Sequence, residues 1–425
     1  MSFALGVVPI LLLLLGFPIF LVLLTAITVA LVFFMNVPLA AMHQNLFGSV
    51  SAYALLAVPY FIYAGELMGR GSVARRLVDF VQSGVGPLRG SIGITTVGTA
   101  TIFGAISGVS AAAVATIGKV MYPSMIKDGY PRPFAAGLIT AVGAIDIIIP
   151  PSIPMIVYGA AAQESVPRLY AAGIIPGLLI ATMLAAYVMW RARSDNFGAG
   201  EPFDFQRFST ATLRSFWALG APVIILGGIY GGVFSPTEAA AVACIYAIVV
   251  TRFVFRELSW RDILEAAAAT TRFTAQILIV VACAGVFSWL LTVNQVPAAL
   301  VNWLQALGVG PWSFLLIVNV VLLLVGCFLD PLSAILLLTP LLIPIVKALG
   351  IDTVHFGIVL MVNLAIGLFT PPFGINIFVA QAVLGIDLKT IYRGILPFAV
   401  LYLVALVLIT YVPALSLAGV WLLLQ

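Results

Sequence analysis

Long apolar segments separated by short polar turns make up most of the chain. Several of these apolar runs reach about 20 residues, the length at which an α-helix crosses the hydrocarbon core of a bilayer. The pattern therefore predicts an all-α polytopic membrane protein. The expected spans are 4–35, with a kink at Gly16, Phe17 and Pro18, then 50–69, 170–190, 215–234, 238–254, 274–291 and 394–423.

Two further apolar segments, 131–165 and 353–386, are interrupted by the adjacent prolines Pro150–Pro151 and Pro371–Pro372. Each pair removes two backbone donors and clashes with the preceding turn, so each segment should split into two half-helices that meet at an unwound joint. In lipid, such a joint is tolerated only where protein buries it or where it lines a polar cavity. The sequence therefore predicts two broken helices in the protein interior.

The two joints occupy the same place in two copies of one unit. Pro150 and Pro371 are 221 residues apart, and the run 84–87 returns unchanged at 308–311. Interrupted apolar segments at matching places in two halves are the best sequence indication of a transporter binding site. The 221-residue spacing also relates Pro123 to Pro344, Gly129 to Gly350, Gly173 to Gly394 and Pro176 to Pro397.

A hairpin is predicted before each broken helix, at 87–126 and at 312–348. The limbs of the first hairpin are short and rich in Gly, Ser and Thr, which suits contact with protein rather than with lipid. Both are therefore expected to be re-entrant hairpins. The tip of the first lies at 107–110 and the tip of the second at 329–333.

Helices that lie along the membrane surface are expected at 71–84, where Arg and Asp alternate with apolar residues, and at 295–307. We expect the hairpins and broken helices to form a transport domain and the other helices to form a scaffold. The resulting segments are 1–86, scaffold with the first surface helix; 87–165, the first half of the transport domain; 166–310, scaffold with an inter-repeat loop at 191–214 and the second surface helix; 311–386, the second half of the transport domain; and 387–425, a C-terminal scaffold helix.

Composition and charge support a membrane protein. With 63% hydrophobic and 8% charged residues, the chain has too little polar surface for a soluble globule. With loop 191–214 in the cytoplasm, only Arg168 and Lys347 of the 19 Lys and Arg lie outside, and the positive-inside rule then fixes the orientation. In this orientation the two hairpins open to opposite sides of the membrane, as an inverted repeat requires.

The net charge of +4 follows this topology and indicates no nucleic-acid partner. The three cysteines, Cys244, Cys283 and Cys327, lack metal-binding spacing and are expected to be buried thiols.

The two tips and two joints offer free main-chain groups near the midplane. Half-helix N-termini attract carboxylates, whereas half-helix C-termini and unwound carbonyls suit a small hard cation. We therefore expect an anionic substrate coupled to Na⁺, with no other cofactor. The first predicted sodium site comprises Ser107, Gly108, Ser110, Gly143, Asp146 and Ile149; the second comprises Gly326, Asp330, Ser333, Gly367, Thr370 and Gly374, with Asn376 beside it; and the predicted substrate-binding residues are Ser110, Ser152, Thr370 and Asn376.

Simpler explanations exist for several of these residues. Small residues are common where membrane helices pack, so the Ser, Thr and Gly residues could serve packing alone. Asp330 stands before Pro331 and fits a helix N-cap, and Glu238 fits the N-terminal turn of a span. Asp146 has no such explanation. Because an ionisable group is costly inside a membrane, a role for Asp146 in cation or proton coupling is expected.

The runs 149–154, 235–241 and 367–374 together resemble the large membrane subunit of tripartite ATP-independent periplasmic (TRAP) transporters. The resemblance covers essentially the whole chain. It implies an elevator-type secondary transporter in the bacterial inner membrane, driven by Na⁺ held between each hairpin tip and the neighbouring joint. It also implies two partners, a small membrane subunit of four helices and a periplasmic binding protein that delivers the substrate. Family substrates are mostly carboxylates, including C4-dicarboxylates, sialic acids and 2-oxo acids.

One residue departs from the family pattern, because many members resemble Gly-Ile or Gly-Leu where this chain has Asp146 followed by three isoleucines. Three other functions stay open. A single-component Na⁺/carboxylate symporter of the same superfamily would lack the two partners, and a channel would not depend on a binding protein. An intramembrane aspartyl protease would pair Asp146 with Asp330. The protease is disfavoured, since the chain lacks a Gly-x-Gly-Asp pattern and proteolysis gives no reason for a duplication.

Overall fold

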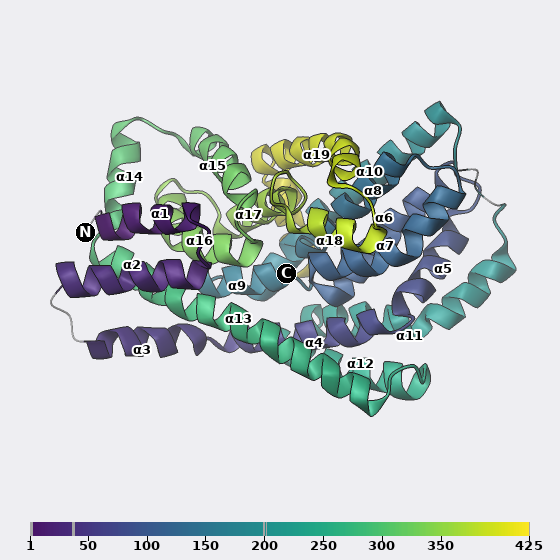
Figure 1. Ribbon diagram of the computed structural model, residues 1–425, viewed down its shortest axis with the longest axis horizontal. Helices are drawn as coiled ribbons and strands as arrows, with labels where there is room; N and C mark the ends of the chain where they lie inside the picture. The colour runs from purple at the N-terminus through teal and green to yellow at the C-terminus, as the bar shows by residue number, and fades with distance from the viewer. Residues whose placement is uncertain (1–2, 36–38, 199, 201, 425) are drawn as a thin grey trace.

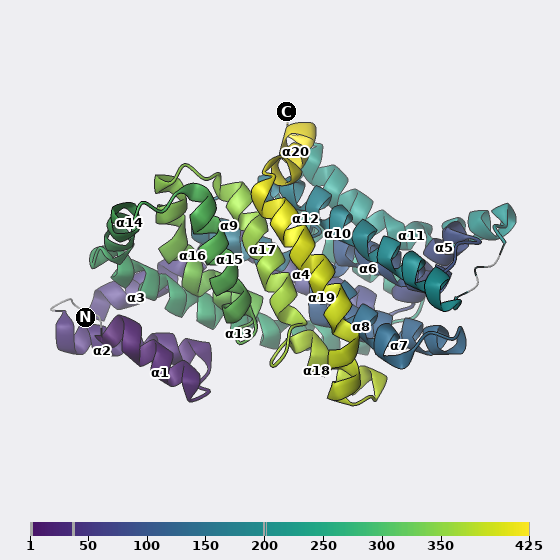
Figure 2. The same cartoon turned by 90° about the horizontal axis from the view of Figure 1, so that it is seen from above.

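The computed structural model describes residues 3–35, 39–198, 200 and 202–424, and these residues form helices with no strand among them (Figures 1 and 2). Six helices of the described chain are long and apolar enough to cross a membrane. The prediction of an all-α polytopic membrane protein is therefore confirmed. The six are α10 (Val166–Asp195), α11 (Phe205–Tyr230), α12 (Pro236–Ile248) with its continuation η4 (Val249–Val254), α13 (Trp260–Val293), α16 (Pro331–Ala348) and α19 (Leu388–Tyr411).

Both predicted hairpins form, whereas their re-entrance into the membrane stays a prediction. In the first, α6 (Ser91–Ser107) turns into α7 (Ser110–Lys127), and in the second, α15 (Pro311–Gly326) turns into α16. The first turn is possible because Gly108 adopts a left-handed conformation with φ of 60° and donates its N–H to the Gly104 carbonyl. The tips at 107–110 and 329–333 therefore lie where the sequence places them.

Both broken helices also form as predicted. The first comprises α8 (Arg132–Val142), the short 3₁₀ segment η3 (Gly143–Ile147) and α9 (Ile153–Ala162). The second comprises α17 (Thr353–Leu368) and α18 (Ile375–Leu384). The first break is the longer one, since regular helix ends at Val142, eight positions before Pro150. The Pro150–Pro151 and Pro371–Pro372 bonds are both cis.

The order of elements is duplicated, and the two copies interlock. The first residues of α7 and α16 are 221 positions apart, as are those of α8 and α17. α9 of the first copy packs on α16 of the second, while α18 of the second packs on α7 of the first. The same exchange brings α19 along α8 and α10 along α17, and Figure 2 shows α17 and α19 crossing the middle of the molecule. The inversion of one copy through the bilayer stays a prediction.

The N-terminal segment corrects one expectation. Residues 4–35 do not form one kinked span, because η1 (Phe3–Val7) and α1 (Val8–Leu14) fold back along α2 (Ile19–Phe34). Gly16, with φ of 80°, ends α1, and Pro18 has no N–H with which to continue it. Figure 1 shows α1 and α2 side by side at one end of the molecule.

Three other boundaries differ from the sequence prediction. α10 and α11 extend into the expected loop 191–214, and of its described residues only 196–198, 200 and 202–204 are outside a helix. Residues 199 and 201 lie outside the described residues. The expected span 274–291 begins earlier, at Trp260, because α13 contains no proline and runs through an alanine-rich segment as one helix of 34 residues. The last span ends at Tyr411, where Val412 and Pro413 separate it from α20 (Ala414–Leu423).

The remaining helices surround the hairpins and broken helices. α3 (Leu39–Val50) is bent by 58° from the segment formed by η2 (Tyr53–Leu56) and α4 (Ala57–Arg70). Helices form where the two surface helices were predicted, as α5 (Val73–Val85) and α14 (Val296–Ala306), and their position along the membrane surface stays a prediction. α13 lies along α2, α3 and α4 and reaches α16 of the second hairpin (Figure 1). Their assignment to a scaffold, like the division into domains, stays a prediction.

Candidate functional site

The two hairpin tips meet at one cavity of about 640 Å³. Residues 108–111 of the first tip and 330–333 of the second line it, although more than 200 positions separate them. Most of the remaining lining is apolar and comes from the two joints, from α13 and from residues 18–20. A volume of this size suits a small solute. The cavity therefore brings together the tip residues of both predicted sites, Gly108 and Ser110 of the first and Asp330 and Ser333 of the second.

Four helices begin at this cavity. Its lining includes the first residues of α7, α9, α16 and α18, which are the limbs and half-helices that follow the tips and joints. Ser152 caps α9 and Asp330 caps α16, whereas no described side chain caps α7 or α18. The N–H groups at those two ends are thus open to another acceptor. Since helix N-termini carry partial positive charge, the cavity favours an anion.

The first tip and the first joint are tied together by hydroxyl groups. Ser107 donates to Asp146 Oδ2 over 2.9 Å, and Ser110 donates to the Gly143 carbonyl over 2.7 Å. The side chain of Asp146 is fully buried, and its other oxygen, Oδ1, accepts no hydrogen bond from the described residues. The sequence brought these four residues into one proposed site, and the structure places them together.

Glycines make this contact possible. A Cβ on Gly104 would stand 2.7 Å from Asp146 Oδ1, and a Cβ on Gly108 would stand 2.7 Å from the Pro151 carbonyl oxygen. The sixth predicted member, Ile149, directs its side chain elsewhere, toward Gly177 of α10. Its side chain seals the far side of the joint rather than facing the tip.

The second tip and the second joint meet through different groups. Gly326 and Gly367 touch backbone to backbone, so that a Cβ on Gly367 would stand 2.4 Å from the Gly326 carbonyl oxygen. The rings of Phe328 and Phe373 lie 5.6 Å apart and are both exposed. No described carboxylate enters this contact, because Asp330 turns to its own helix and accepts the Ser333 N–H over 3.1 Å. The capping interpretation of Asp330 is therefore confirmed, and Asp330 and Asp146 make no hydrogen bond with each other.

Several predicted residues bond locally. The Ser152 hydroxyl donates to the Ile147 carbonyl over 2.7 Å, and the Thr370 hydroxyl donates to the Ile366 carbonyl over 2.6 Å. Gly374 donates its N–H to the Thr370 carbonyl and tightens the second joint. Of the four residues predicted to bind substrate, only Ser110 lines the cavity directly.

The cysteines largely match the prediction of buried thiols. Cys244 and Cys283 are buried as expected, whereas Cys327, beside the second tip, is partly exposed.

Asn376, two residues after Gly374 of the second joint, also reaches the first site, which the sequence did not predict. Its amide donates to the Ser110 hydroxyl over 2.9 Å and to the Thr140 carbonyl over 3.2 Å. It is fully buried on α18, which packs against α7 and α8 of the other copy. The reason is that the two copies interlock, so that α18, the half-helix after the second joint, packs against the first hairpin tip.

Comparison with known proteins identifies this arrangement. Residues 7–415 match the family model of the tripartite ATP-independent periplasmic transporter, DctM component. The chain belongs to this family. It is 40% identical over 374 residues to the C4-dicarboxylate TRAP transporter large permease protein of Pseudomonas aeruginosa, with 88% of each chain covered. It is 36% identical over 411 residues to the ectoine/5-hydroxyectoine TRAP transporter large permease protein of Ruegeria pomeroyi, with 96% of each covered.

The fold of this TRAP large permease subunit is shared with a solved transporter. The YdaH transporter of Alcanivorax borkumensis superposes with a TM-score of 0.65 at 16% identity, covering 98% of each chain. At that identity the likeness concerns the fold alone. The resemblance read from the sequence is confirmed, and the relatives of the TRAP permease are transport proteins rather than enzymes.

Sequence reasoning missed the part of the TRAP permease cavity that α13 supplies. Phe273, Gln276, Ile277 and Val280 line the cavity together with the two tips. The one available signal was Gln276, a single amide within an apolar segment, where a polar side chain is costly unless it has a partner. With Ser110, Asp330 and Ser333, it completes the polar side chains of the lining.

Proposed function

We propose that this TRAP large permease subunit takes up a small anionic solute by coupling its entry to Na⁺. The observation that carries the proposal is the meeting of four helix N-termini at one cavity, directly beside a buried carboxylate. The N-termini suit the anion, and the carboxylate suits the cation. A site for each charge at one place is what symport requires.

The cavity supports an anion bound through main-chain groups. None of the described lining residues is Lys or Arg, and Asp330 is the one carboxylate, already used as a cap. The open N-termini of α7 and α18 are therefore the positive elements that face the solute. A carboxylate is the group we expect, although the named substrates of the relatives include both a C4-dicarboxylate and ectoine.

The surroundings of Asp146 support a sodium ion at the first site. A fully buried carboxylate with one oxygen unpartnered is costly unless a cation or a proton joins it. Ser107 and the main-chain carbonyls of the 3₁₀ segment Gly143–Ile147 supply further oxygens nearby. We propose that Na⁺ binds here between the tip and the joint, with Asp146 as its charged ligand.

The second sodium site rests on weaker support. Thr370 and the glycines Gly326, Gly367 and Gly374 lie at the second joint, and main-chain carbonyls would have to supply most of the ligands. Replacing Thr370 or Asp330 with Ala is expected to lower the apparent affinity for Na⁺. A sodium titration of uptake that does not shift in either variant would remove the second site from the proposal.

The packing supports an elevator motion in which the interlocked copies move together. α10 and α19 pack along the broken helix of the opposite copy. This favours their moving with the transport domain, rather than standing in the fixed scaffold to which the sequence prediction assigned them. α13 lies across the cavity from the tips and is the proposed fixed wall.

The test is uptake by the purified subunit in proteoliposomes, together with the proposed partners, a small four-helix membrane subunit and a periplasmic binding protein. A radiolabelled anion such as a C4-dicarboxylate should accumulate only with an inward Na⁺ gradient. Accumulation that is equal in K⁺ would contradict Na⁺ coupling.

Omitting the partners separates the remaining functions. A TRAP system in the inner membrane should lose uptake when the binding protein is left out, whereas a single-component symporter or a channel would not. Co-purification of the small subunit with this chain is the matching biochemical observation. A panel that contains ectoine beside dicarboxylates would narrow the substrate.

A further inference from the structure

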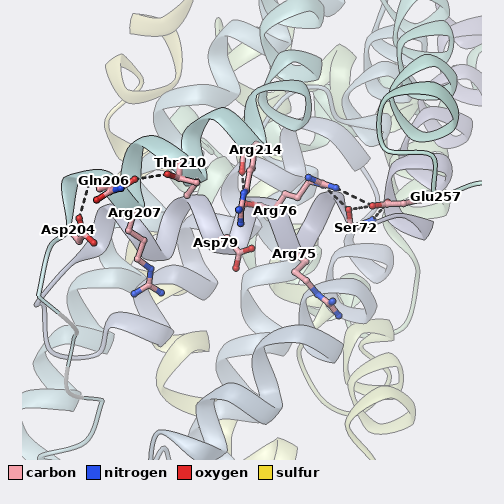
Figure 3. Close-up of a pocket in the computed structure, with 12 residues that line it drawn as sticks. Ser72, Arg75, Arg76, Asp79, Asp204, Gln206, Arg207, Thr210, Arg214 and Glu257 are labelled. Atoms are coloured by element: carbon pink, nitrogen blue, oxygen red, sulfur yellow. Dashed lines mark hydrogen bonds and ion pairs between the residues drawn. The ribbon is translucent and has the colours of Figure 1, made fainter.

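A second pocket, of about 520 Å³, shares no residue with the transport cavity, and more than half of the residues that line it are charged (Figure 3). It is formed by the surface helix α5, by the first turns of α11, and by the loop before α13. These are the segments that the positive-inside rule places in the cytoplasm. The charged lining residues are Arg75, Arg76, Asp79, Asp204, Arg207, Arg214 and Glu257.

Two of the three carboxylates in this pocket already have partners. Asp204 caps α11 by accepting the Gln206 N–H over 2.8 Å. Glu257 accepts hydrogen bonds from Ser72 and pairs with Arg76 over 3.3 Å, and Figure 3 shows Arg76 reaching toward it. Burial raises the pKa of Glu257, but the hydrogen bonds from Ser72 and the charge of Arg76 outweigh it and keep this carboxylate ionised.

The remaining charges are predominantly positive. Arg75, Asp79 and Arg214 make no hydrogen bond or ion pair with the side chains that the structure describes. Figure 3 shows Asp79 on α5 and Arg214 on α11 at facing sides of the pocket, with Arg207 and Arg75 to either side. Arg207 and Arg214 are seven positions apart, so they share one face of α11, roughly 10 Å apart along its axis. Guanidinium groups bind phosphate through paired, charge-assisted hydrogen bonds.

The same turns of α11 also carry apolar side chains that face outward. Leu213 is 73% exposed and Phe216 is 62% exposed, and Phe205 and Trp217 are exposed with them. Exposed aromatic residues at the end of a span are typical of the membrane interface. On α5, the buried face of Val73, Ala74, Leu77 and Val78 turns the arginines outward along the same boundary. The pocket thus combines a basic opening with an apolar rim.

We propose that this pocket binds the headgroup of an anionic phospholipid of the cytoplasmic leaflet. The phosphate lies among Arg75, Arg207 and Arg214, and the acyl chains follow the apolar side chains of α11. A free phosphate ion would use the arginines but leave the apolar rim uncovered. The lipid ties α5 to α11 and anchors this end of the molecule at the membrane surface.

The test measures lipid binding by the purified full chain in detergent, by native mass spectrometry and by thermal unfolding. The probes are phosphatidylglycerol, phosphatidylcholine, and sodium phosphate with glycerol 3-phosphate as the soluble sources. Each arginine is expected to contribute roughly fivefold to affinity for the anionic lipid, so R75Q/R214Q should lose roughly 25-fold. The matched control, K119Q/R393Q, removes two exposed charges outside the pocket and should keep the affinity.

The outcomes separate the possibilities. Preferential binding of phosphatidylglycerol that R75Q/R214Q loses and K119Q/R393Q keeps supports the proposal. Equal binding of phosphatidylcholine, or equal loss in both double variants, overturns it. Equal protection by the soluble phosphates overturns the assignment to a lipid. R75K/R214K keeps the charges and should recover part of the affinity, which guards against a folding defect in the Gln variant.

Discussion

The two proline joints of this TRAP permease have the same arrangement of helices but differ in the groups that contact the neighbouring hairpin. At the first joint, Gly104 of the hairpin makes room for the side chain of Asp146. At the second, Gly326 of the hairpin meets Gly367 backbone to backbone. Asp146 and Gly367 are 221 positions apart, so the carboxylate stands where the other copy has a glycine. One copy therefore carries a charge that the other lacks.

The two joints also differ in how far their residues are exposed. Ser107, Asp146 and Ser152 at the first joint are buried, whereas Pro371, Pro372 and Phe373 at the second are exposed. α10 closes the first joint, since a Cβ on Gly173 would stand 2.3 Å from the Ile148 carbonyl oxygen. A charged site needs this closure to keep water from competing for its ligands. The comparison suggests a rigid first site and a more open second one.

The largest effect is expected from G367A. Its new methyl group meets the Gly326 backbone, which cannot rotate away, so we expect a loss of about 1–3 kcal/mol of stability and of nearly all uptake. The methyl group of G104A meets the Asp146 carboxylate at 2.7 Å, which can turn, and the Asp146 Cα only at 3.1 Å, so G104A should cost less. Thermal unfolding and uptake measure both, and G227A, whose methyl group enters open space, is the control. Equal losses in G104A and G367A would contradict the proposed difference between the joints.

D146N is expected to have the next largest effect. Removing the charge from the buried site should raise the Na⁺ concentration for half-maximal uptake about tenfold, while expression stays normal. The matched variant D330N keeps the helix cap, because Asn caps as well as Asp, and should shift the value less than about twofold. A titration of uptake against Na⁺ and against pH measures both. Unchanged coupling in D146N would remove Asp146 from the mechanism.

N376A should have a smaller effect. It removes the amide that links α18 to Ser110 and Thr140, at a cost of about 1–3 kcal/mol, and should lower uptake several-fold. The side chain of Gln381, on the same helix, makes no hydrogen bond with the described residues, so Q381A should stay within about 0.5 kcal/mol of the parent. If N376A unfolds at the same temperature as Q381A, the link between the copies is not stabilising.

The smallest effect concerns the helices that follow the joints. Ser165 caps α10, whereas Asp387, 222 positions later, caps α19. The hydrogen bond from the Thr390 side chain, with smaller contributions from main-chain N–H groups, lowers the pKa of Asp387. Its stabilising contribution is therefore present at neutral pH and is lost as the pH falls through the lowered value.

D387N keeps a cap that does not titrate. The difference in unfolding temperature between parent and D387N should change by an amount on the order of 1 °C between pH 7 and pH 3. S165A should be destabilised equally at both pH values. A D387N variant whose unfolding temperature follows that of the parent at every pH would show that the Asp387 cap does not titrate in this range.

Much of this fold could be predicted because its strongest constraints are local. Adjacent prolines end a helix wherever they occur, and Gly108 ends α6 through its own backbone conformation. Ser235 and Glu238 form the capping box that begins α12, as their spacing indicates. The errors arose where a local signal was ambiguous. Gly16 and Pro18 are compatible with a kink in one helix and also with a reversal of the chain between two helices. Only the packing of α1 on α2 distinguishes these two conformations.

The sequence by itself determined the class of fold, the duplication, the two tips and the two joints, since helix length, proline and glycine act within a few residues. It also singled out Asp146, because a lone carboxylate in an apolar run stands out in any context. Only the tertiary structure decided that both tips share one cavity, that Gln276 faces them, and that Asn376 crosses to Ser110. These features depend on how segments hundreds of residues apart pack, and no local pattern records that.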